Sequence, residues 1–227
     1  MPQQLTFDLP ARTSRERGDF YVTDSNAVAM AAIEQWAQWP SHKMVIVGPA
    51  GAGKSHLARV WCDLSGAALI ESQLLSTVLP TDYTGQHVLI EDADRIAGDD
   101  EAEEALFHLH NLVLAEGGSL LLTSRAAPSR WGLALPDLAS RMEATPTAVL
   151  DVPDETLIAA IIVKLFDDRQ IAAPPSVVNY LAPRLPRSLR DVADMVAALD
   201  AMSLTEGRAV NRRMAQALLD KMDANSA

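Results

Sequence analysis

Short runs of apolar residues alternate along the first two thirds of the chain with stretches in which apolar residues recur every three or four positions. The runs predict five strands, at residues 44–47, 67–71, 87–94, 119–125 and 147–150. The periodic stretches between them predict helices. Strands that alternate with helices are typical of a parallel sheet flanked by helices, so we predict a three-layered α/β domain.

The predicted helices of this part have recognisable start and stop residues. Asp24 and Ser25 can begin a helix that runs to about Gln38. Pro80 ends another, predicted over residues 72–78. The remaining helices are expected over residues 56–64, from the acidic stretch 98–104 to Gly117, and over residues 136–142.

The pattern changes at Asp154, after which only helices are predicted. Asp154 can cap the first of them. Prolines at 174–175 and 183–186 separate the next two, and the last begins at Asn211. The expected division is a flexible tail at residues 1–18, an α/β domain at 19–152 and a small all-helical domain at 153–227.

A glycine-rich segment joins the first predicted strand to the helix that follows it. It fits the pattern G-x-x-x-x-G-K-[ST], in which backbone N–H groups surround phosphate oxygens at a helix N-terminus. In this pattern Lys54 neutralises the β- and γ-phosphate oxygens, and the Ser55 hydroxyl reaches Mg²⁺. A plain glycine turn is the alternative, but the flanking strand and helix favour nucleotide binding. The expected binding residues are Gly48, Pro49, Ala50, Gly51, Ala52, Gly53, Lys54, Ser55 and His56.

Two carboxylates end the third predicted strand. An apolar strand followed by acids is the Walker B arrangement, which delivers one acid to the Mg²⁺ shell while the next polarises the attacking water. We expect Glu91, with Ser55, to hold the metal and Asp92 to face the water. Solvation of the strand end is the alternative. At the end of the fourth strand, Thr123 and Ser124 can sense the γ-phosphate or cap the strand.

Composition narrows the range of functions. The chain has 227 residues, 48% of them hydrophobic, and can bury a full core. A net charge of −11 argues against a protein that grips nucleic-acid backbones, which requires clustered Lys and Arg. The single cysteine, Cys62, excludes an internal disulfide. No membrane-length apolar run or signal segment is seen, so we expect a cytoplasmic protein without a membrane partner.

The first ten residues contain an unusual apolar pattern. Leu5, Phe7 and Leu9 alternate with polar residues, ahead of a polar stretch at 11–18. One interpretation is an edge strand folded back on the domain. The other is an extended peptide that docks on a partner, with these side chains as anchors and Gln4 as the polar contact. The segment resembles the short peptide with which bacterial proteins bind the replication sliding clamp.

Together these motifs resemble the AAA+ ATPase family, and within it the DnaA group. The resemblance covers residues 19 to about 220. It matches 48–55 to Walker A, 88–92 to Walker B, 121–124 to the strand-end sensor, Leu138-Ala139-Ser140-Arg141 to the arginine-finger box and Leu189-Arg190-Asp191-Val192 to the lid arginine. It implies that the helical domain is a lid, that Arg190 joins the nucleotide-binding residues, and that Arg141 is catalytic.

Two departures from the family pattern bear on the chain's own ATPase activity. The initiators have Asp-Asp after the Walker B strand, where this chain has Glu91 and Asp92. They also have Asp in the sensor motif, where this chain has Arg125. The longer Glu91 and the missing sensor Asp predict slow intrinsic hydrolysis and tight ADP binding.

The initiators also carry a DNA-binding domain after the lid and a longer N-terminal domain, which this chain is not expected to have. A chain that lacks these two domains and begins with a clamp-like peptide resembles the Hda group of regulatory inactivators of DnaA. The resemblance implies tethering to the DNA-loaded sliding clamp and hydrolysis of DnaA-bound ATP, with Arg141 presented in trans. The expected cofactors are ADP or ATP with Mg²⁺, and the expected partners are DnaA and the clamp, with DNA contacted only indirectly. The alternatives are a stand-alone AAA+ ATPase or loader, a non-catalytic adaptor and a truncated DnaA-like initiator.

Overall fold

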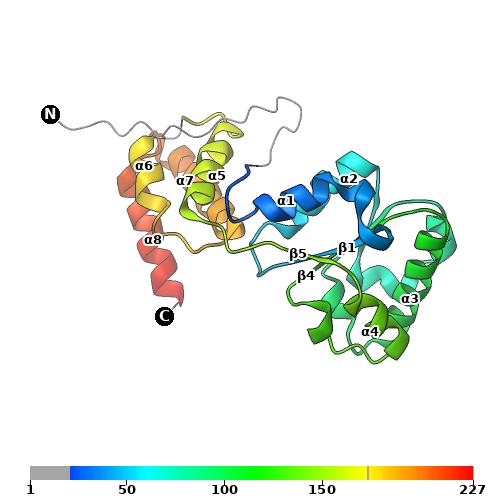
Figure 1. Ribbon diagram of the computed structural model, residues 1–227. Helices are drawn as coiled ribbons and strands as arrows, with labels where there is room; N and C mark the ends of the chain where they lie inside the picture. Colours follow the sequence, from blue (N-terminus) through cyan, green and yellow to red (C-terminus); the bar gives the residue numbers. More distant parts are fainter. Residues whose placement is uncertain (1–20, 173, 227) are drawn as a thin grey trace.

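A five-stranded sheet forms the middle layer of the first part of the molecule (Figure 1). The computed structural model describes residues 21–172 and 174–226. The strands are β1 Lys43–Val47, β2 Ala68–Glu71, β3 Val88–Glu91, β4 Leu120–Ser124 and β5 Thr147–Val149. They lie in the order β2-β3-β4-β1-β5, and every neighbouring pair is parallel. The predicted parallel α/β fold is therefore confirmed.

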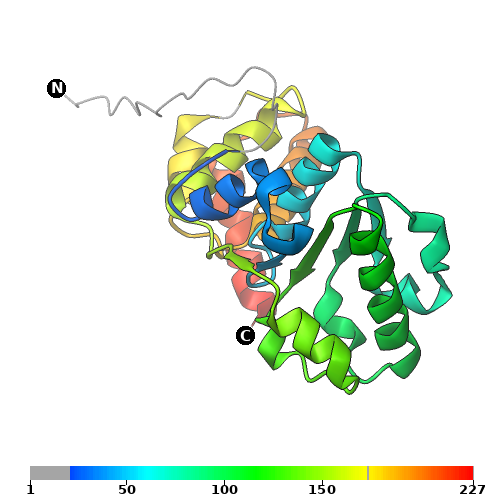
Figure 2. The same cartoon turned by 45° about the vertical axis from the view of Figure 1, so that its right-hand side comes forward.

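Helices cover both faces of the sheet (Figures 1 and 2). They are α1 Ala27–Glu34, α2 Lys54–Ser65, α3 Asp100–Ala115 and α4 Pro136–Glu143. Alternate side chains of β1 enter two different cores, because successive residues of a strand point to opposite faces. Ile46 packs with residues of α1 and α2, whereas Val45 packs with residues of α3 and α4.

Two predicted helices differ in detail from the structure. Helix α1 has Asn26 as its N-cap and not Asp24 or Ser25, because the Asn26 side chain accepts from Thr23 N (2.9 Å) and keeps the preceding residues outside the helix. It ends at Glu34 and is followed by a short 3₁₀ turn. The helix predicted over residues 72–78 is a 3₁₀ helix, Ser72–Thr77.

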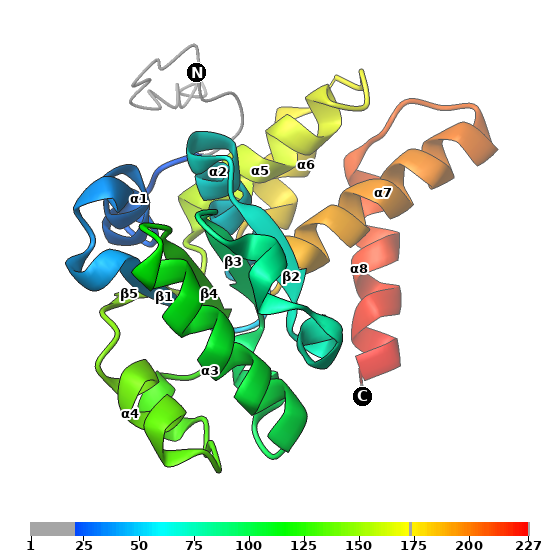
Figure 3. The ribbon, with the colours of Figure 1, turned by 90° about the vertical axis from the view of Figure 1, so that its right-hand side faces the viewer.

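The second part of the chain is helical. It consists of α5 Glu155–Asp167, α6 Pro175–Leu181, α7 Leu189–Glu206 and α8 Arg212–Ser226. These helices share a core of their own, with Phe166, Leu181 and Leu199 among its buried residues. They lie beside the sheet on the side away from α3 and α4 (Figures 1 and 3). None of the helices in the described part of the chain is long and apolar enough to cross a membrane.

Candidate nucleotide-binding site

The segment between β1 and α2 forms a tight loop at the carboxyl end of β1. Its shape requires glycine at three positions. Gly51 and Gly53 have left-handed backbone conformations, with φ of +75° and +102°. A Cβ atom on Gly48 would lie 2.5 Å from the carbonyl oxygen of Leu150, so a larger residue would displace the strand end.

Lys54 is the first residue of α2, and its side chain folds back over this loop. Its ammonium donates to the carbonyl oxygens of Gly48 (2.8 Å) and Pro49 (3.0 Å). Only 7% of the residue is exposed. Burial lowers the pKa of Lys54, and Asp92 opposes that effect. A cation is thus held inside a loop at a helix N-terminus, an arrangement that favours anions.

Ser55 and His56 follow Lys54 in the first turn of α2. Both are exposed on the surface beside the loop. The Ser55 hydroxyl is therefore accessible from the solvent side of the phosphate loop.

Three carboxylates follow one another closely at the end of β3. Glu91 ends the strand, and its Oε1 atom is buried without a hydrogen-bond partner among the described residues. Asp92 has a left-handed backbone (φ +53°) and lies 3.3 Å from Arg95 Nε. Asp94 accepts from Arg125 N at 3.0 Å, and its other oxygen is buried and unpaired in the described part of the chain. All three carboxylates raise the pKa of Lys54, Asp92 most strongly.

Two of these three acids, Glu91 and Asp92, are the ones predicted from the sequence as site residues. The structure brings both Glu91 and Asp92 beside the phosphate loop. It adds Asp94, which was not predicted as a site residue and is recognisable from sequence only as the third acid after an apolar strand.

The hydroxyl groups at the end of β4 form hydrogen bonds with the protein backbone. Thr123 Oγ1 accepts from Asp92 N at 2.9 Å, and Ser124 Oγ donates to the Ala126 carbonyl at 2.7 Å. Both residues are buried. Of the two interpretations of this strand end, the structure favours capping, because each hydroxyl fixes a neighbouring backbone segment.

The donor atoms near the loop suit a magnesium ion bound together with phosphates. No group of three or more His, Cys, Asp or Glu side chains within the described residues is arranged to hold a metal by itself. Mg²⁺ in phosphate sites needs only one or two protein oxygens, since phosphates and water supply the rest. The unpaired Oε1 of Glu91 and the exposed Ser55 hydroxyl are such oxygens.

The helical part contacts the phosphate loop through the start of α7. Leu189 N donates to the Gly51 carbonyl at 2.8 Å. Ser188, the N-cap of α7, packs so closely on the loop that a Cβ atom on Gly51 would lie 2.8 Å from Ser188 Cβ. Arg190 follows, but its side chain is 86% exposed and lies 4.0 Å from Asp194. The helix start touches the loop, whereas the Arg190 side chain extends into solvent.

The fold is shared with solved structures of DnaA and RuvB. No protein-family model matches the chain. Domain III of the replication initiation protein DnaA from Thermotoga maritima has a TM-score of 0.79 and 23% identity, over 89% of this chain and 94% of that one. This chain has a DnaA-like fold. AMPPCP-bound DnaA from Aquifex aeolicus gives a TM-score of 0.68 at 16% identity, over 80% of this chain and 63% of that one. A mutant of RuvB from Thermotoga maritima gives 0.65 at 15%, over 88% and 68%.

Within this fold, the Arg141 backbone lies at the edge of the sheet opposite to the phosphate loop. Its carbonyl oxygen is 2.9 Å from the ammonium of Lys43, the first residue of β1, whereas the loop follows the last residue of that strand. A five-residue strand is about 16 Å long. Figures 1 and 3 show α4 at the far end of the sheet from α7. The Arg141 backbone is therefore far from the chain's own phosphate loop, and its guanidinium lies over the Phe107 ring of α3.

The segment before α1 lies near the loop. Asp151 N donates to the Ser25 carbonyl at 3.2 Å, next to Leu150, which packs against the loop. Tyr21 and Val22, in this segment, are 41% and 56% exposed. These positions suit either ordinary packing or contact with a nucleotide base. Gln4, Leu5, Phe7 and Leu9 lie outside the described residues.

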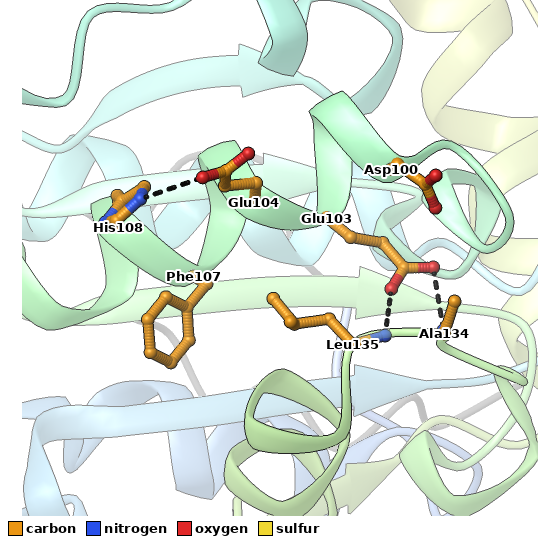
Figure 4. Close-up of a pocket in the computed structure, with 7 residues that line it drawn as sticks. All are labelled: Asp100, Glu103, Glu104, Phe107, His108, Ala134 and Leu135. Atoms are coloured by element: carbon orange, nitrogen blue, oxygen red, sulfur yellow. Dashed lines mark hydrogen bonds and ion pairs between the residues drawn. The ribbon is translucent and has the colours of Figure 1, made fainter.

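A groove of about 450 Å³ lies between the start of α3 and the chain before α4, and no phosphate-loop residue lines it (Figure 4). Glu103 is buried in its wall and accepts hydrogen bonds from the backbone N–H groups of Gly98 (3.0 Å), Ala134 (3.1 Å) and Leu135 (2.8 Å). Burial tends to raise the pKa of Glu103, but these three bonds hold it below its usual range. Phe107 lines the same groove.

Proposed function

We propose that the loop Gly48–Ser55 binds ATP or ADP with Mg²⁺. The left-handed glycines and the buried ammonium of Lys54 support this, and a solved structure of a DnaA of the same fold is AMPPCP-bound. Ser55 and Glu91 would hold the metal. Bound Mg²⁺ would supply positive charge that offsets the phosphate oxygens.

We further propose an Hda-type role, in which the chain promotes hydrolysis of ATP held by DnaA and so represses re-initiation of replication. The observation that carries this proposal is the position of Arg141. An exposed arginine whose backbone lies at the edge opposite to its own phosphate loop would be available to a nucleotide held by a neighbouring molecule. Arginine fingers presented in trans accelerate phosphoryl transfer by roughly 10³- to 10⁵-fold where they have been measured.

The chain's own nucleotide would then have a structural role. The phosphate loop belongs to the proposed base domain, residues 19–152. It contacts the start of α7 in the proposed lid, residues 153–227. A nucleotide at this junction would fix the angle between them, with Arg190 turning inward to meet its phosphates. Glu91 in place of Asp and Arg125 in place of the sensor Asp favour slow turnover and tight ADP binding.

We propose that the N-terminal segment tethers the protein to the replication sliding clamp. Gln4, Leu5, Phe7 and Leu9 would form an extended peptide with alternating anchors. DNA would then be reached only through the clamp and DnaA, in the cytoplasm.

The test is to follow hydrolysis of ATP preloaded on DnaA in the presence of clamp-loaded DNA. Wild-type protein is expected to accelerate hydrolysis, and both Arg141→Ala and a combined Gln4→Ala, Leu5→Ala, Phe7→Ala variant are expected to fail. Arg130→Ala is the matched control, because this exposed arginine lies on the short turn before α4. It is expected to act as the wild type does.

Other outcomes would support the alternatives. Fast ATP turnover by the protein alone, abolished by Lys54→Ala, would favour a stand-alone ATPase. Full activity of Arg141→Ala would favour an adaptor without a catalytic arginine. Salt-sensitive binding of duplex DNA by the isolated chain would favour a DnaA-like initiator.

A further inference from the structure

Lys43 is a buried lysine that the proposed chemistry does not use. It is 7% exposed at the start of β1. Its ammonium donates to the carbonyl oxygen of Arg141 (2.9 Å) and lies 3.2 Å from His110 Nε2. Since burying an ammonium is costly unless its hydrogen bonds are replaced, these two partners account for its presence there.

The contact between Lys43 and His110 determines the state of the imidazole. An ammonium group can only donate, so Nε2 of His110 must accept. The ring proton is then on Nδ1, which faces Asn111 Oδ1 at 3.2 Å. Burial, with Lys43 as a second cause, lowers the pKa of His110 to about 4. The imidazole is therefore a neutral acceptor that holds the ammonium in place near pH 7.

The ammonium is directed at the last turn of α4. The carbonyl groups at a helix C-terminus carry partial negative charge and lack partners within the helix, so a cation there is stabilising. Thr145 Oγ1 donates to the same oxygen of Arg141 at 2.8 Å. Lys43 thus ties α4 to the sheet at the residue that carries the candidate finger, and Thr145 is a second, local donor to the same carbonyl.

Helix α3 also contacts the side chain of Arg141. The guanidinium carbon lies 5.2 Å from the centre of the Phe107 ring, close enough for a cation–π interaction. Phe107 and His110 are three residues apart and so lie on neighbouring turns of one helix face. One helix therefore supports Arg141 twice, through Lys43 at the backbone and through Phe107 at the guanidinium.

We propose that Lys43, held by neutral His110, is a positioning residue that fixes where Arg141 presents its guanidinium. The ammonium and the guanidinium repel each other, as the lowered pKa of Lys43 beside Arg141 reflects after the larger effect of burial. With the backbone tied inward, the side chain extends outward across Phe107. The catalytic consequence rests on the proposed function of Arg141, whereas the positioning is a property of this chain alone.

The positioning can be tested without DnaA, by NMR of arginine-labelled protein. The Nε–H signal of Arg141, assigned by its loss in Arg141→Gln, is expected to be displaced by the Phe107 ring current and to return to the range of exposed arginines in Phe107→Leu. Lys43→Met should move it in the same direction, and Thr145→Val should do so less. Thr205→Val is the matched control, because Thr205 also donates to a helical carbonyl, that of Ala201, but in α7.

An unmoved Arg141 signal in folded Lys43→Met would overturn the proposal. If Lys43→Met does not fold, Thr145→Val decides, since this near-isosteric change removes one of the two donors to the same carbonyl. An Arg141 signal that moves equally in Thr205→Val would also contradict it, because the displacement would then be unspecific.

The consequence for catalysis is measured in the DnaA-bound ATP assay. Lys43→Met is expected to lower the maximal stimulated rate by about 10- to 100-fold, since a shift of about 1 Å in a positioned group has effects of this size. The protein concentration giving half-maximal stimulation should stay within about twofold. An unchanged maximal rate would overturn the catalytic part. No stimulation by wild type would instead refute the proposed function, while the NMR result would still decide the positioning.

Discussion

At the residue scale, single side chains acquire their properties from neighbours far away in sequence. Lys54 and Lys43 are both buried lysines at the ends of elements, but they have opposite surroundings. Three carboxylates and Arg125 act on the pKa of Lys54 at the carboxyl edge of the sheet, whereas Lys43 meets a neutral imidazole, a carbonyl and the Arg141 cation, with no carboxylate among the causes of its pKa shift. The first arrangement suits a phosphate ligand bound with Mg²⁺, and the second suits a structural support.

The buried imidazole predicts how stability depends on pH. Between about pH 6.5 and pH 4, His110 takes up a proton in the unfolded chain but not in the folded one. The free energy of unfolding should therefore fall as the pH is lowered through this range, by up to about 3 kcal/mol from this group. In His110→Gln, which keeps an acceptor for Lys43 but does not titrate, this part of the slope should disappear.

Urea unfolding at pH 7, 5.5 and 4.5 measures the effect. His108→Gln on the same helix is the matched control, because that side chain is 58% exposed. An equal loss of slope in both variants would contradict the assignment to the buried ring.

At the element scale, boundaries follow side chains that bond to the backbone. Asp99, Asp154 and Ser188 cap α3, α5 and α7, each accepting from the backbone N–H three residues later. The strands were predictable because a parallel sheet covered on both faces buries continuous apolar runs. The start of α1 was misplaced because Asp24, Ser25 and Asn26 are all good caps, and only the contacts of Asn26 with residues before the helix distinguish it.

The Asp154 cap gives a prediction at this scale. Burial tends to raise the pKa of Asp154, but hydrogen bonds from Leu157 N and from Thr23 and Ser25 hold it below its usual range. Asp154→Ala should therefore lower the free energy of unfolding by about 1–2 kcal/mol near pH 7. Because the folded pKa is depressed, this difference is present above about pH 3.9 and should be lost as the pH falls through the folded value.

Chemical denaturation of wild type and variant tests the cap. Asp137→Ala serves for comparison, since Asp137 is an exposed acid in the first turn of α4 but not its cap. Equal destabilisation by the two substitutions would show that the charge near a helix start, and not the cap, is responsible.

At the scale of the whole molecule, the contact between the phosphate loop and α7 couples the two parts of the chain. Gly51 and Gly66 offer a matched pair, because both have left-handed backbones, at φ +75° and +72°. A Cβ atom on Gly51 would meet Ser188, whereas one on Gly66 would meet nothing within 4 Å. Both alanine variants carry the strain of a left-handed backbone, but only Gly51→Ala pushes the start of α7 away from the phosphate loop.

We therefore expect Gly66→Ala to bind nucleotide as the wild type does and Gly51→Ala to bind at least about tenfold more weakly, since close backbone approach to phosphate requires glycine. Fluorescent ADP titration measures this. Adding Ser188→Gly to Gly51→Ala should recover part of the affinity by removing the clash. Similar affinities for Gly51→Ala and Gly66→Ala would show that nucleotide binding does not depend on the contact between Gly51 and α7.

The sequence by itself determined the alternating strands and helices and the strand–loop–helix unit with Lys54, because these depend on local patterns: apolar runs, glycines and a lysine at fixed spacing. The tertiary structure alone decided that Thr123 caps the backbone at Asp92, that Asp94 joins the acids near Lys54, and that Arg141 lies at the opposite edge of the sheet. It also brought Lys43 to His110, 67 residues away. Such contacts depend on which strands are neighbours and how helices pack over them, which local patterns do not specify.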